Sequence, residues 1–343
     1  MYLFGKRTEI SEMVRRDFYV DDLMTGCQSI EEGLTIKEKM TELLQRSGFL
    51  LQKWVSSNQE LNLQISEDLG EKKSERGKDI KTDEYSVQLP PQQKPITKRR
   101  VISDISRLYD PLGWVSPCVI ISKTFIQKIW LSGIDWDQEL TSDLLREWES
   151  YRKDLEHISK CQIPRWVETR PDDQLIELHG FCDASVAAYA AVVYIRVVDA
   201  EGIVKVNLVT SRTKVAPVKQ QSIPRLELMG AVLLSELITE VAEVMNIPKS
   251  NIHAYTDSSV VLAWLSDHPS RWSTFVGNRV SQILTSDWGD RLTMQELQMN
   301  QYTHVCLILE VVHWWSWLLQ APEGAYCCGL RANEKYLKSP FFW

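Results

Sequence analysis

Apolar and polar positions alternate in different ways along the chain, and the changes divide its 343 residues into blocks. Residues 1–58 contain a short apolar run, FYV, then apolar positions that mostly keep to helical spacing, and residues 49–54 alternate as in a strand. Ser29 is suited to cap the helix, with Glu32 three residues later, and Gly48 is suited to follow its end. This block therefore predicts a strand, a helix and a second strand.

Two polar segments interrupt the chain further on. Residues 59–97 are mixed in charge and end in the proline-rich run QLPPQQKP, which is typical of a linker. Residues 98–170 become helical in pattern, with a turn at the Asp-Pro-Leu-Gly of residues 110–113 and a helical run that ends near residue 157. A shorter connector, residues 164–173, closes this block.

After the second connector the apolar period becomes that of strands. Three strands precede a helix that begins at Pro224, and a fourth strand precedes a short helix. Hairpin strands that give way to alternating strand and helix predict a mixed sheet covered by helices, which is an α/β fold. The predicted strands are residues 176–181, 187–198, 203–213 and 252–256, and the short helix is residues 258–265.

Composition and charge place the chain among globular proteins. Hydrophobic residues make up 44% and charged residues 25%, and the formal net charge is −7, so any surface that binds nucleic acid must be local. The seven cysteines form no CxxC pair and the six histidines show no metal-ligand spacing, so neither a disulfide framework nor a zinc site is expected. The polar N-terminus and the short apolar stretch of residues 305–319 fit neither a signal peptide nor a membrane span. We therefore expect an intracellular protein with no membrane partner.

Three acidic residues stand at positions where a metal site can form. Asp183 and Asp257 each end a predicted strand, in FCDAS and AYTDSS, and Glu227 lies in the first turn of the helix that begins at Pro224. Mg²⁺ takes a few carboxylate oxygens and keeps several waters, and two such ions can activate a water and stabilise the leaving oxygen of a phosphodiester. Each residue alone is more typical of a turn, a cap or a contact with the helix dipole than of catalysis. Their order and setting make a site for two metal ions the stronger interpretation.

The segments around these residues resemble one family. FCDAS, SIPRLELMGA, AYTDSS and VLAWLSDHPSRWSTFVGNRVSQI resemble the ribonuclease H domain of BEL/Pao-type LTR retrotransposons. The resemblance implies a ribonuclease H-like mixed sheet with flanking helices over residues 171–288. It also implies that Asp183, Glu227 and Asp257 are catalytic, that they are three of the four ligands of a two-Mg²⁺ site, and that no small-molecule cofactor is used. The implied substrate is an RNA–DNA hybrid, with single-stranded nucleic acid as an alternative partner.

The family's fourth ligand is missing from its motif. The family has a Trp-x-His-Val sequence and then an Asn-Pro-Ala-Asp whose Asp completes the site, whereas this chain continues after Trp288 as GDRLTMQELQMNQ. Asp287, Asp290 and Glu296 are nearby acids that stand outside the motif. We therefore expect a damaged site, and residues 289–343, which are rich in Trp and Cys, are interpreted as a divergent tail produced by a frameshift.

A polymerase motif lies near the start of the chain. An aromatic residue followed closely by Asp21 and Asp22, in FYVDD, resembles the metal-binding turn of reverse transcriptase palms in the same retroelements. Paired aspartates in a turn are also common in proteins without this function. Residues 1–58 are interpreted as a palm and thumb remnant. Polymerase chemistry needs a further aspartate from an earlier strand and fingers to hold the template, so no polymerase activity is expected.

The segment KRRVISDISRLYDPLGWVSPCVIISKTFIQKIW resembles the Pao retrotransposon segment between polymerase and ribonuclease H, which carries a peptidase label. The chain lacks the Asp-Thr/Ser-Gly turn of an aspartic protease, since Asp257 is followed by two serines, and no Cys/His or Ser/His pair stands out. Residues 98–170 are therefore interpreted as a connection region that holds the nucleic-acid duplex. Lys98, Arg99 and Arg100 are candidate phosphate contacts, with a solvated cluster as the equal alternative.

The three blocks occur in the family's order, so the chain is interpreted as a fragment of a retrotransposon Pol polyprotein whose partner is the rest of that polyprotein. Its ancestral role would be RNA-directed DNA synthesis and Mg²⁺-dependent cleavage of RNA in a hybrid. The expected location is a cytoplasmic retroelement particle, with the nucleus as an alternative. Two other functions remain open: a ribonuclease H fold that binds nucleic acid without cutting it, and a non-functional product of a decayed element.

Overall fold

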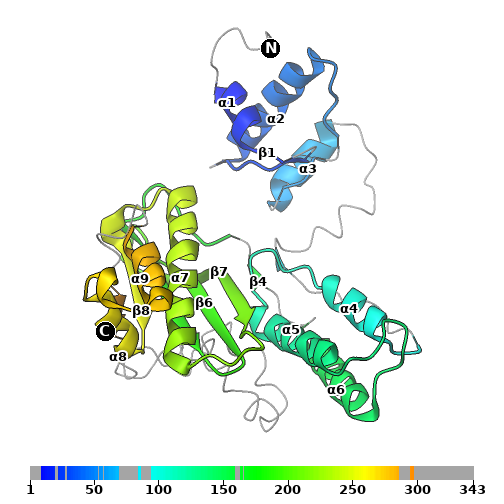
Figure 1. Ribbon diagram of the computed structural model, residues 1–343. Coiled ribbons are helices and arrows are strands. Elements are labelled where there is room, and N and C mark those ends of the chain that lie inside the picture. The colour runs from blue at the N-terminus through cyan, green and yellow to red at the C-terminus, as the bar shows by residue number, and fades with distance from the viewer. Residues whose placement is uncertain are drawn as a thin grey trace. The chain divides into compact units, whose positions relative to one another are not determined.

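The fold is taken from a computed structural model, in which the chain divides into two compact units, Met1–Glu84 and Tyr85–Trp343. Figure 1 shows the helices and strands of the two units. Within the described residues, no helix has both the length and the apolar character needed to cross a membrane. The structure describes residues 9–19, 22–27, 29–52, 54–56, 58–68, 84–85, 94–158, 163–164, 166–285 and 294–296.

The first unit is built from helices around one short hairpin. Ser29 caps its longest helix, because the Ser29 hydroxyl accepts a hydrogen bond of 3.1 Å from the backbone N–H of Glu32, as the sequence predicts. Gly48 has a φ of +83°, but it lies two residues after the C-cap Arg46, one position later than predicted. The elements are α1 (Glu9–Arg16), β1 (Phe18–Tyr19), β2 (Asp22–Leu23), α2 (Ile30–Gln45) and α3 (Gln59–Asp68).

Two predictions for this unit are wrong. Residues 49–52 and 54 pair with no other strand, and the side chains of Phe49 and Leu50 are 66% and 70% exposed. The alternating pattern there had no partner strand, and an isolated strand is not stable in water. The first ten residues of the expected linker form α3, whose buried Leu61 packs against Gly33 of α2.

The hairpin carries part of the predicted polymerase motif. Tyr19 of β1 pairs with Asp22 of β2 in antiparallel register. Val20 and Asp21, which complete the motif, lie outside the described residues.

Three helices form the first part of the second unit: α4 (Lys98–Ser106), α5 (Ser116–Leu131) and α6 (Ser142–Ile158). The single helical run expected to end near residue 157 is therefore two helices, separated by a segment in which Gly133 has a φ of +72°. Their shared core includes Val101, Phe125, Ile129 and Trp148. The short strands β3 (Glu84–Tyr85) and β4 (Ile163–Pro164) lie before and after these helices in sequence.

A mixed five-stranded sheet forms the second part, in the order β7-β6-β5-β8-β9. The first three strands in this order are antiparallel, and β8 and β9 run parallel to β5. The predicted α/β fold is confirmed, although the fifth strand lies beyond residue 288, in the block interpreted as a divergent tail. The strands are β5 (Leu175–Ala184), β6 (Ala188–Val198), β7 (Val204–Val215), β8 (Ile252–Thr256) and β9 (Met294–Glu296).

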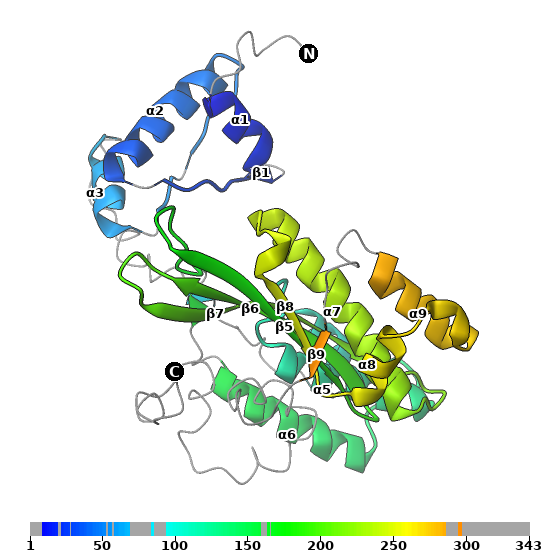
Figure 2. The same cartoon turned by 90° about the vertical axis from the view of Figure 1, so that its left-hand side faces the viewer.

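The longest helix that the structure describes covers one face of this sheet. Helix α7 (Ile223–Met245) packs on β5 and β6, and α9 (Thr274–Thr285) packs on α7, so that both lie on one side of the strands while α5 and α6 lie on the other (Figure 2). The core between α7 and the sheet contains Leu178, Leu234 and Ile238. The remaining elements are α8 (Ser259–Leu265) and the short 3₁₀ helices η2 (Lys249–Asn251) and η3 (Pro269–Arg271).

The predicted turn at residues 110–113 joins the connection region to the edge of the sheet. Strand β7 has an extra residue, Val209, between its pairs with β6, and the Val209 carbonyl accepts a hydrogen bond of 2.8 Å from the indole N–H of Trp114. The backbone N–H of Ser211 donates to the carbonyl of Leu112 at 2.9 Å. Gly113 has a φ of +71°, and a Cβ atom there would lie 1.9 Å from the Ser211 carbonyl oxygen. The connection region and the sheet are therefore packed together as one body.

Candidate active site

Strand register brings two of the predicted site residues together. Strands β5 and β8 are parallel neighbours whose last paired residues are Cys182 and Thr256. The next residue in each chain is an aspartate, Asp183 in β5 and Asp257 directly after β8. The Asp183 carboxylate also accepts a hydrogen bond of 2.6 Å from the N–H of Ala184, which fixes its orientation. The two aspartates therefore stand side by side at the carboxyl ends of the strands.

Helix α7 supplies the third acid. Glu227 lies directly after its first turn, one position further into the helix than predicted, and Gly230 three residues later allows the helix to approach the sheet closely. A Cβ atom at Gly230 would lie 3.3 Å from the Asp183 carbonyl oxygen and 3.7 Å from the Cβ of Cys182. This close approach places the start of α7, and with it Glu227, beside the strand end that carries Asp183.

A hydrogen bond places Glu227 beside the two aspartates. Its Oε2 atom accepts a hydrogen bond of 2.6 Å from the hydroxyl of Ser258, the residue directly after Asp257. The Cys182 side chain is buried beneath the end of the sheet, where burial raises the pKa of its thiol and the three negative charges raise it further. The structure therefore brings the three predicted residues together.

Ser258 is a site residue that the sequence interpretation missed. Its hydroxyl donates a hydrogen bond of 2.6 Å to Oε2 of Glu227 and accepts one of 3.2 Å from the N–H of Val261 as the N-cap of α8. The side chain is buried, so it holds the Glu227 carboxylate against the start of α8. The available signal was a serine directly after Asp257 at the predicted helix start.

The three carboxylates suit a hard cation. Asp257 is exposed, and Asp183 and Glu227 are partly exposed, so their oxygens can reach a hydrated ion. Mg²⁺ prefers such oxygen ligands and retains several waters in its shell. The donor set therefore fits the predicted ion, and the chemistry that it allows is displacement at a phosphodiester.

The backbone of one further acid, Glu296, lies next to the strand that leads to Asp257. Strand β9 pairs with β8 so that Glu296 stands opposite Thr256, the residue before Asp257. Asp287 and Asp290, the other nearby acids, lie outside the described residues, as does the tail after Glu296. The frameshift hypothesis for that tail therefore stays a hypothesis.

A second group of metal-ligating side chains lies earlier on the same two strands. His179 pairs with His253 in the parallel register, and Glu177 precedes His179 by two residues. Their potential ligand atoms all lie within 4.8 Å of one another. The expectation of no zinc site rested on spacing along the sequence, whereas pairing across strands brings these three side chains together. The signal was that each histidine precedes a site aspartate by four residues, in HGFCD and HAYTD.

The three basic residues at the start of the connection region are engaged within the protein. Lys98 is buried, with its ammonium nitrogen 3.7 Å from the ring centre of Trp130 and 3.2 Å from the Ile134 carbonyl oxygen. Arg99 forms an ion pair with Asp137 at 2.8 Å, and Arg100 donates to the carbonyl of Pro95 at 2.7 Å. Burial of Lys98 rules out a phosphate contact there, so that prediction is wrong for Lys98.

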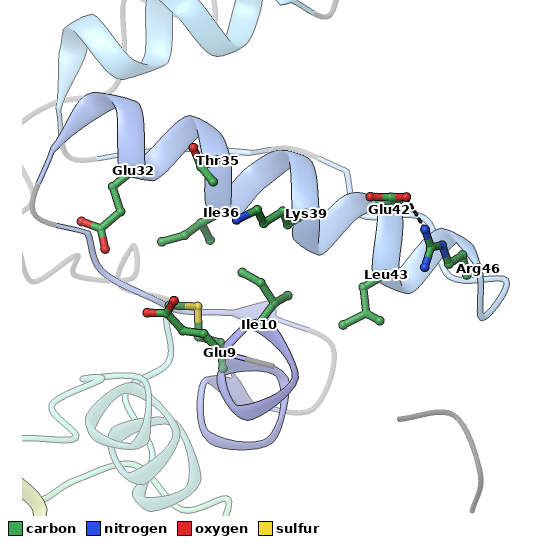
Figure 3. A pocket seen from close by; sticks show the side chains of 10 residues that line it. Glu9, Ile10, Glu32, Thr35, Ile36, Lys39, Glu42, Leu43 and Arg46 are labelled. Carbon is green, nitrogen blue, oxygen red and sulfur yellow. Dashed lines mark hydrogen bonds and ion pairs between the residues drawn. The ribbon is translucent and has the colours of Figure 1, made fainter. Parts of the chain in front are cut away.

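An open groove in the first unit offers no comparable chemistry. It lies between α1 and α2, has a volume of about 560 Å³, and is lined by glutamates, basic side chains and aliphatic residues (Figure 3). Two of the charged residues, Glu42 and Arg46, form an ion pair with each other. The groove holds no convergent set of acids or of nitrogen and sulfur ligands among the described residues.

Comparisons with known proteins agree with this fold. Residues 97–258 match the family model of the Pao retrotransposon-like RNaseH-like domain, a range that contains Asp183, Glu227 and Asp257. No curated protein matches the sequence. The matched range includes the three helices of the connection region and four strands of the sheet, and it ends before β9.

The solved structures that the chain matches include two foamy viral proteins and one archaeal protein. The foamy viral protease-reverse transcriptase dRH in complex with double-stranded DNA is 15% identical, with 84% of this chain and 47% of that chain covered and a TM-score of 0.46. The foamy viral protease-reverse transcriptase with double-stranded DNA is 15% identical, with 84% and 56% covered and a TM-score of 0.44. RNase H1 from Halobacterium salinarum NRC-1 is 14% identical, with 34% and 80% covered and a TM-score of 0.22. The chain spans about half the length of the two foamy viral proteins.

Proposed function

We propose that this chain, whose residues 97–258 belong to the Pao retrotransposon-like RNaseH-like domain family, is part of a retroelement Pol polyprotein that cleaves the RNA strand of an RNA–DNA hybrid. The observation that carries the proposal is the gathering of Asp183, Glu227 and Asp257 around the end of β5. These three residues would hold Mg²⁺, which would supply the positive charge that activates a water and stabilises the leaving oxygen. Loss of the family's fourth acid would leave this activity impaired.

Two arginines beside the first turn of α7 support a nucleic-acid substrate. Arg225 and Arg279 flank the ring of Phe275, with their guanidinium carbons 4.9 Å and 3.6 Å from its centre. Burial lowers the pKa of Arg279, and the neighbouring positive charge of Arg225 lowers it further. Neither guanidinium has a carboxylate partner among the residues that the structure describes. Two neighbouring positive groups without such partners are suited to bind the phosphates of a nucleic-acid strand that lies across Glu227.

A binding module without catalysis is the second candidate function. The observation that favours it is that the sequence after Trp288 lacks the Asn-Pro-Ala-Asp motif whose Asp completes the family's site. Such a module would hold the hybrid through Arg225 and Arg279 and would leave the RNA strand intact.

Cleavage of a labelled RNA–DNA hybrid by the full chain, with Mg²⁺ or Mn²⁺, tests the proposal. The full chain is required because residues 112–114 bind the edge strand β7, and a fragment that starts after them would expose that edge. We expect slow cleavage that Asp183→Asn abolishes and that Asp172→Asn, which replaces an exposed acid of the connector, leaves intact. A folded chain that binds the hybrid without cutting it would establish the binding module instead. A folded chain that neither binds nor cuts would overturn both functions.

A further inference from the structure

The sheet face turned away from α7 carries a cluster of two histidines and one glutamate. Side chains alternate between the two faces of a strand, and Leu178 and Cys182 pack toward α7, so Glu177 and His179 point to the opposite face. His253 lies beside His179 on β8, with the two rings stacked at 19° and their centres 4.8 Å apart. We propose that Glu177, His179 and His253 form a binding site for Zn²⁺, separate from the carboxylate site.

The distances between the ligand atoms are close to those that zinc requires. Nε2 of His253 lies 3.4 Å from Oε1 of Glu177, and Nε2 of His179 lies 3.8 Å from Oε2. Tetrahedral zinc has bonds of about 2.0–2.1 Å to nitrogen and oxygen, which puts its ligand atoms about 3.3 Å apart. The three ligand atoms lie within 4.8 Å of one another, so rotation of the two stacked rings toward a common point would be needed to bring them to one ion. Three protein ligands leave the fourth position for water.

His179 has a nitrogen that hydrogen-bonds none of the residues that the structure describes. This Nε2 atom is buried, and its distance of 3.8 Å to Oε2 of Glu177 is too long for a hydrogen bond. A buried polar atom without a partner is costly, and a bound ion would satisfy it. The other ring nitrogen, Nδ1, lies 3.4 Å from the Tyr255 hydroxyl. In metal sites, a hydrogen bond at the nitrogen that does not bind the metal fixes the orientation of the histidine ring, and Tyr255 is placed to do this here.

Charge and burial keep the histidine in the form that binds metal. Burial, with a further contribution from His253, lowers the pKa of His179 to about 4, so the ring is neutral at neutral pH. Arg196 binds Oε2 of Glu177 at 2.6 Å, so the hydrogen-bonded carboxylate still offers Oε1 to the ion. Although burial alone would raise the pKa of Glu177, Arg196 lowers it, so the carboxylate stays ionised. Two imidazoles and one carboxylate select zinc over magnesium.

The proposed zinc site and the carboxylate site lie on the same strands but do not overlap. His179 precedes Asp183 by four residues, and His253 precedes Asp257 by four. Four residues of strand span about 13 Å. A zinc ion at the histidines would link β5 to β8 without contacting the three carboxylates.

Zinc binding by the full chain, after treatment with a chelator, tests this inference. We expect one Zn²⁺ per chain by calorimetry, with an affinity at least about tenfold lower in His253→Gln and in Glu177→Gln. The matched control His268→Gln replaces an exposed histidine outside the cluster and should retain the affinity of the unmodified chain. X-ray absorption should show only nitrogen and oxygen ligands, at about 2.0–2.1 Å.

Three results would overturn the zinc site. They are the absence of zinc binding, sulfur ligands at about 2.3 Å, which would place the ion on cysteines, and full affinity in both cluster variants. Circular dichroism and melting of each variant show whether it is folded, and Glu177→Gln decides the question if His253→Gln does not fold. Cleavage is not a readout here, so failure of zinc binding and failure of the proposed function are distinguishable.

Discussion

The side chains at the carboxyl ends of β5 and β8 differ in chemistry and in exposure from those four residues earlier in the same two strands. At the carboxyl ends, Asp183 and Asp257 present oxygens that water can reach. Earlier in the strands, His179 and His253 present nitrogens beside the aromatic rings of Phe181 and Tyr255, and only 17% of the His179 side chain is exposed. One register, with a His-x-x-x-Asp sequence in each strand, thus produces two sites of opposite chemistry.

The difference shows that exposure to solvent, more than strand pairing, determines which metal ion each position of the sheet would bind. Paired strands place like residues side by side at every position, both at the strand ends and further inside. Solvated carboxylates at the strand end favour a hard ion that keeps its waters. Neutral imidazoles in an aromatic, poorly solvated place favour a borderline ion with nitrogen ligands.

The largest expected effect separates the two sites. Asp257→Asn removes a negative charge from the carboxylate site, and metal-based stabilisation of charge is worth several kcal/mol, so cleavage should fall by about 100-fold or more. Zinc affinity in the same variant should stay within about twofold, because the histidines lie about 13 Å away. Parallel measurements of hybrid cleavage and zinc calorimetry check this. Loss of zinc binding in folded Asp257→Asn would show that the two sites are coupled.

The next effect concerns acid, and it should act on the histidine site. The pKa of His179 is about 4 in the fold and 6.5 ordinarily, so the unfolded chain binds a proton first as the pH falls. The stability that comes from the neutral ring is therefore present above pH 6.5 and is lost toward pH 4. At pH 5 the free energy of unfolding should be lower by about 2 kcal/mol than at pH 7.5. The charged and titratable groups that face this ring are Glu177, Arg196, His253 and Tyr255.

Urea unfolding in the presence of a chelator, at pH 7.5 and pH 5, measures this loss. His179→Gln should remove most of the difference, and His268→Gln should keep it. Saturating Zn²⁺ should enlarge the difference, because the ion competes with protons for the same nitrogens. Equal pH dependence in the His179 variant and the unmodified chain would contradict this assignment.

Local patterns in the sequence predicted the elements around the carboxylate site well. Strand β8 has the predicted bounds of residues 252–256, and α7 begins at Ile223, one residue before the predicted start at Pro224. The order of the strands and helices and the motifs then placed Asp183 and Asp257 at strand ends. Such features depend on periodicity and capping, which neighbouring residues determine.

Contacts between distant residues could not be predicted in the same way. The stacking of His179 on His253 requires the parallel register of β5 and β8, and the insertion of Trp114 at Val209 requires an extra residue in β7. Neither follows from spacing along the chain. The strand expected at residues 49–54 failed for the related reason that alternation predicts a strand only where a partner exists.

The smallest expected effect tests whether Ser258 positions Glu227 or only caps a helix. Ser258→Ala removes the hydroxyl that donates to Oε2 of Glu227 at 2.6 Å and that accepts from the N–H of Val261. Loss of the cap should lower the free energy of unfolding by about 1 kcal/mol. Loss of the orienting bond should lower cleavage about tenfold and raise the Mg²⁺ concentration needed for half-maximal cleavage.

A matched variant, Ser266→Ala, removes a hydroxyl that donates to the carbonyl of Ala263 at the other end of α8, away from the carboxylates. It should leave both cleavage and its Mg²⁺ dependence unchanged, while Ser258→Thr, which keeps a hydroxyl, should restore much of what Ser258→Ala loses. A purely structural role for Ser258 would lower stability without moving the Mg²⁺ dependence. Because Glu227 comes from a helix and the two aspartates come from strands, the carboxylate site needs a hydrogen bond to hold its third ligand. The histidine site takes all three of its ligands from paired strands, where Tyr255 contacts the His179 ring and Arg196 contacts the Glu177 carboxylate.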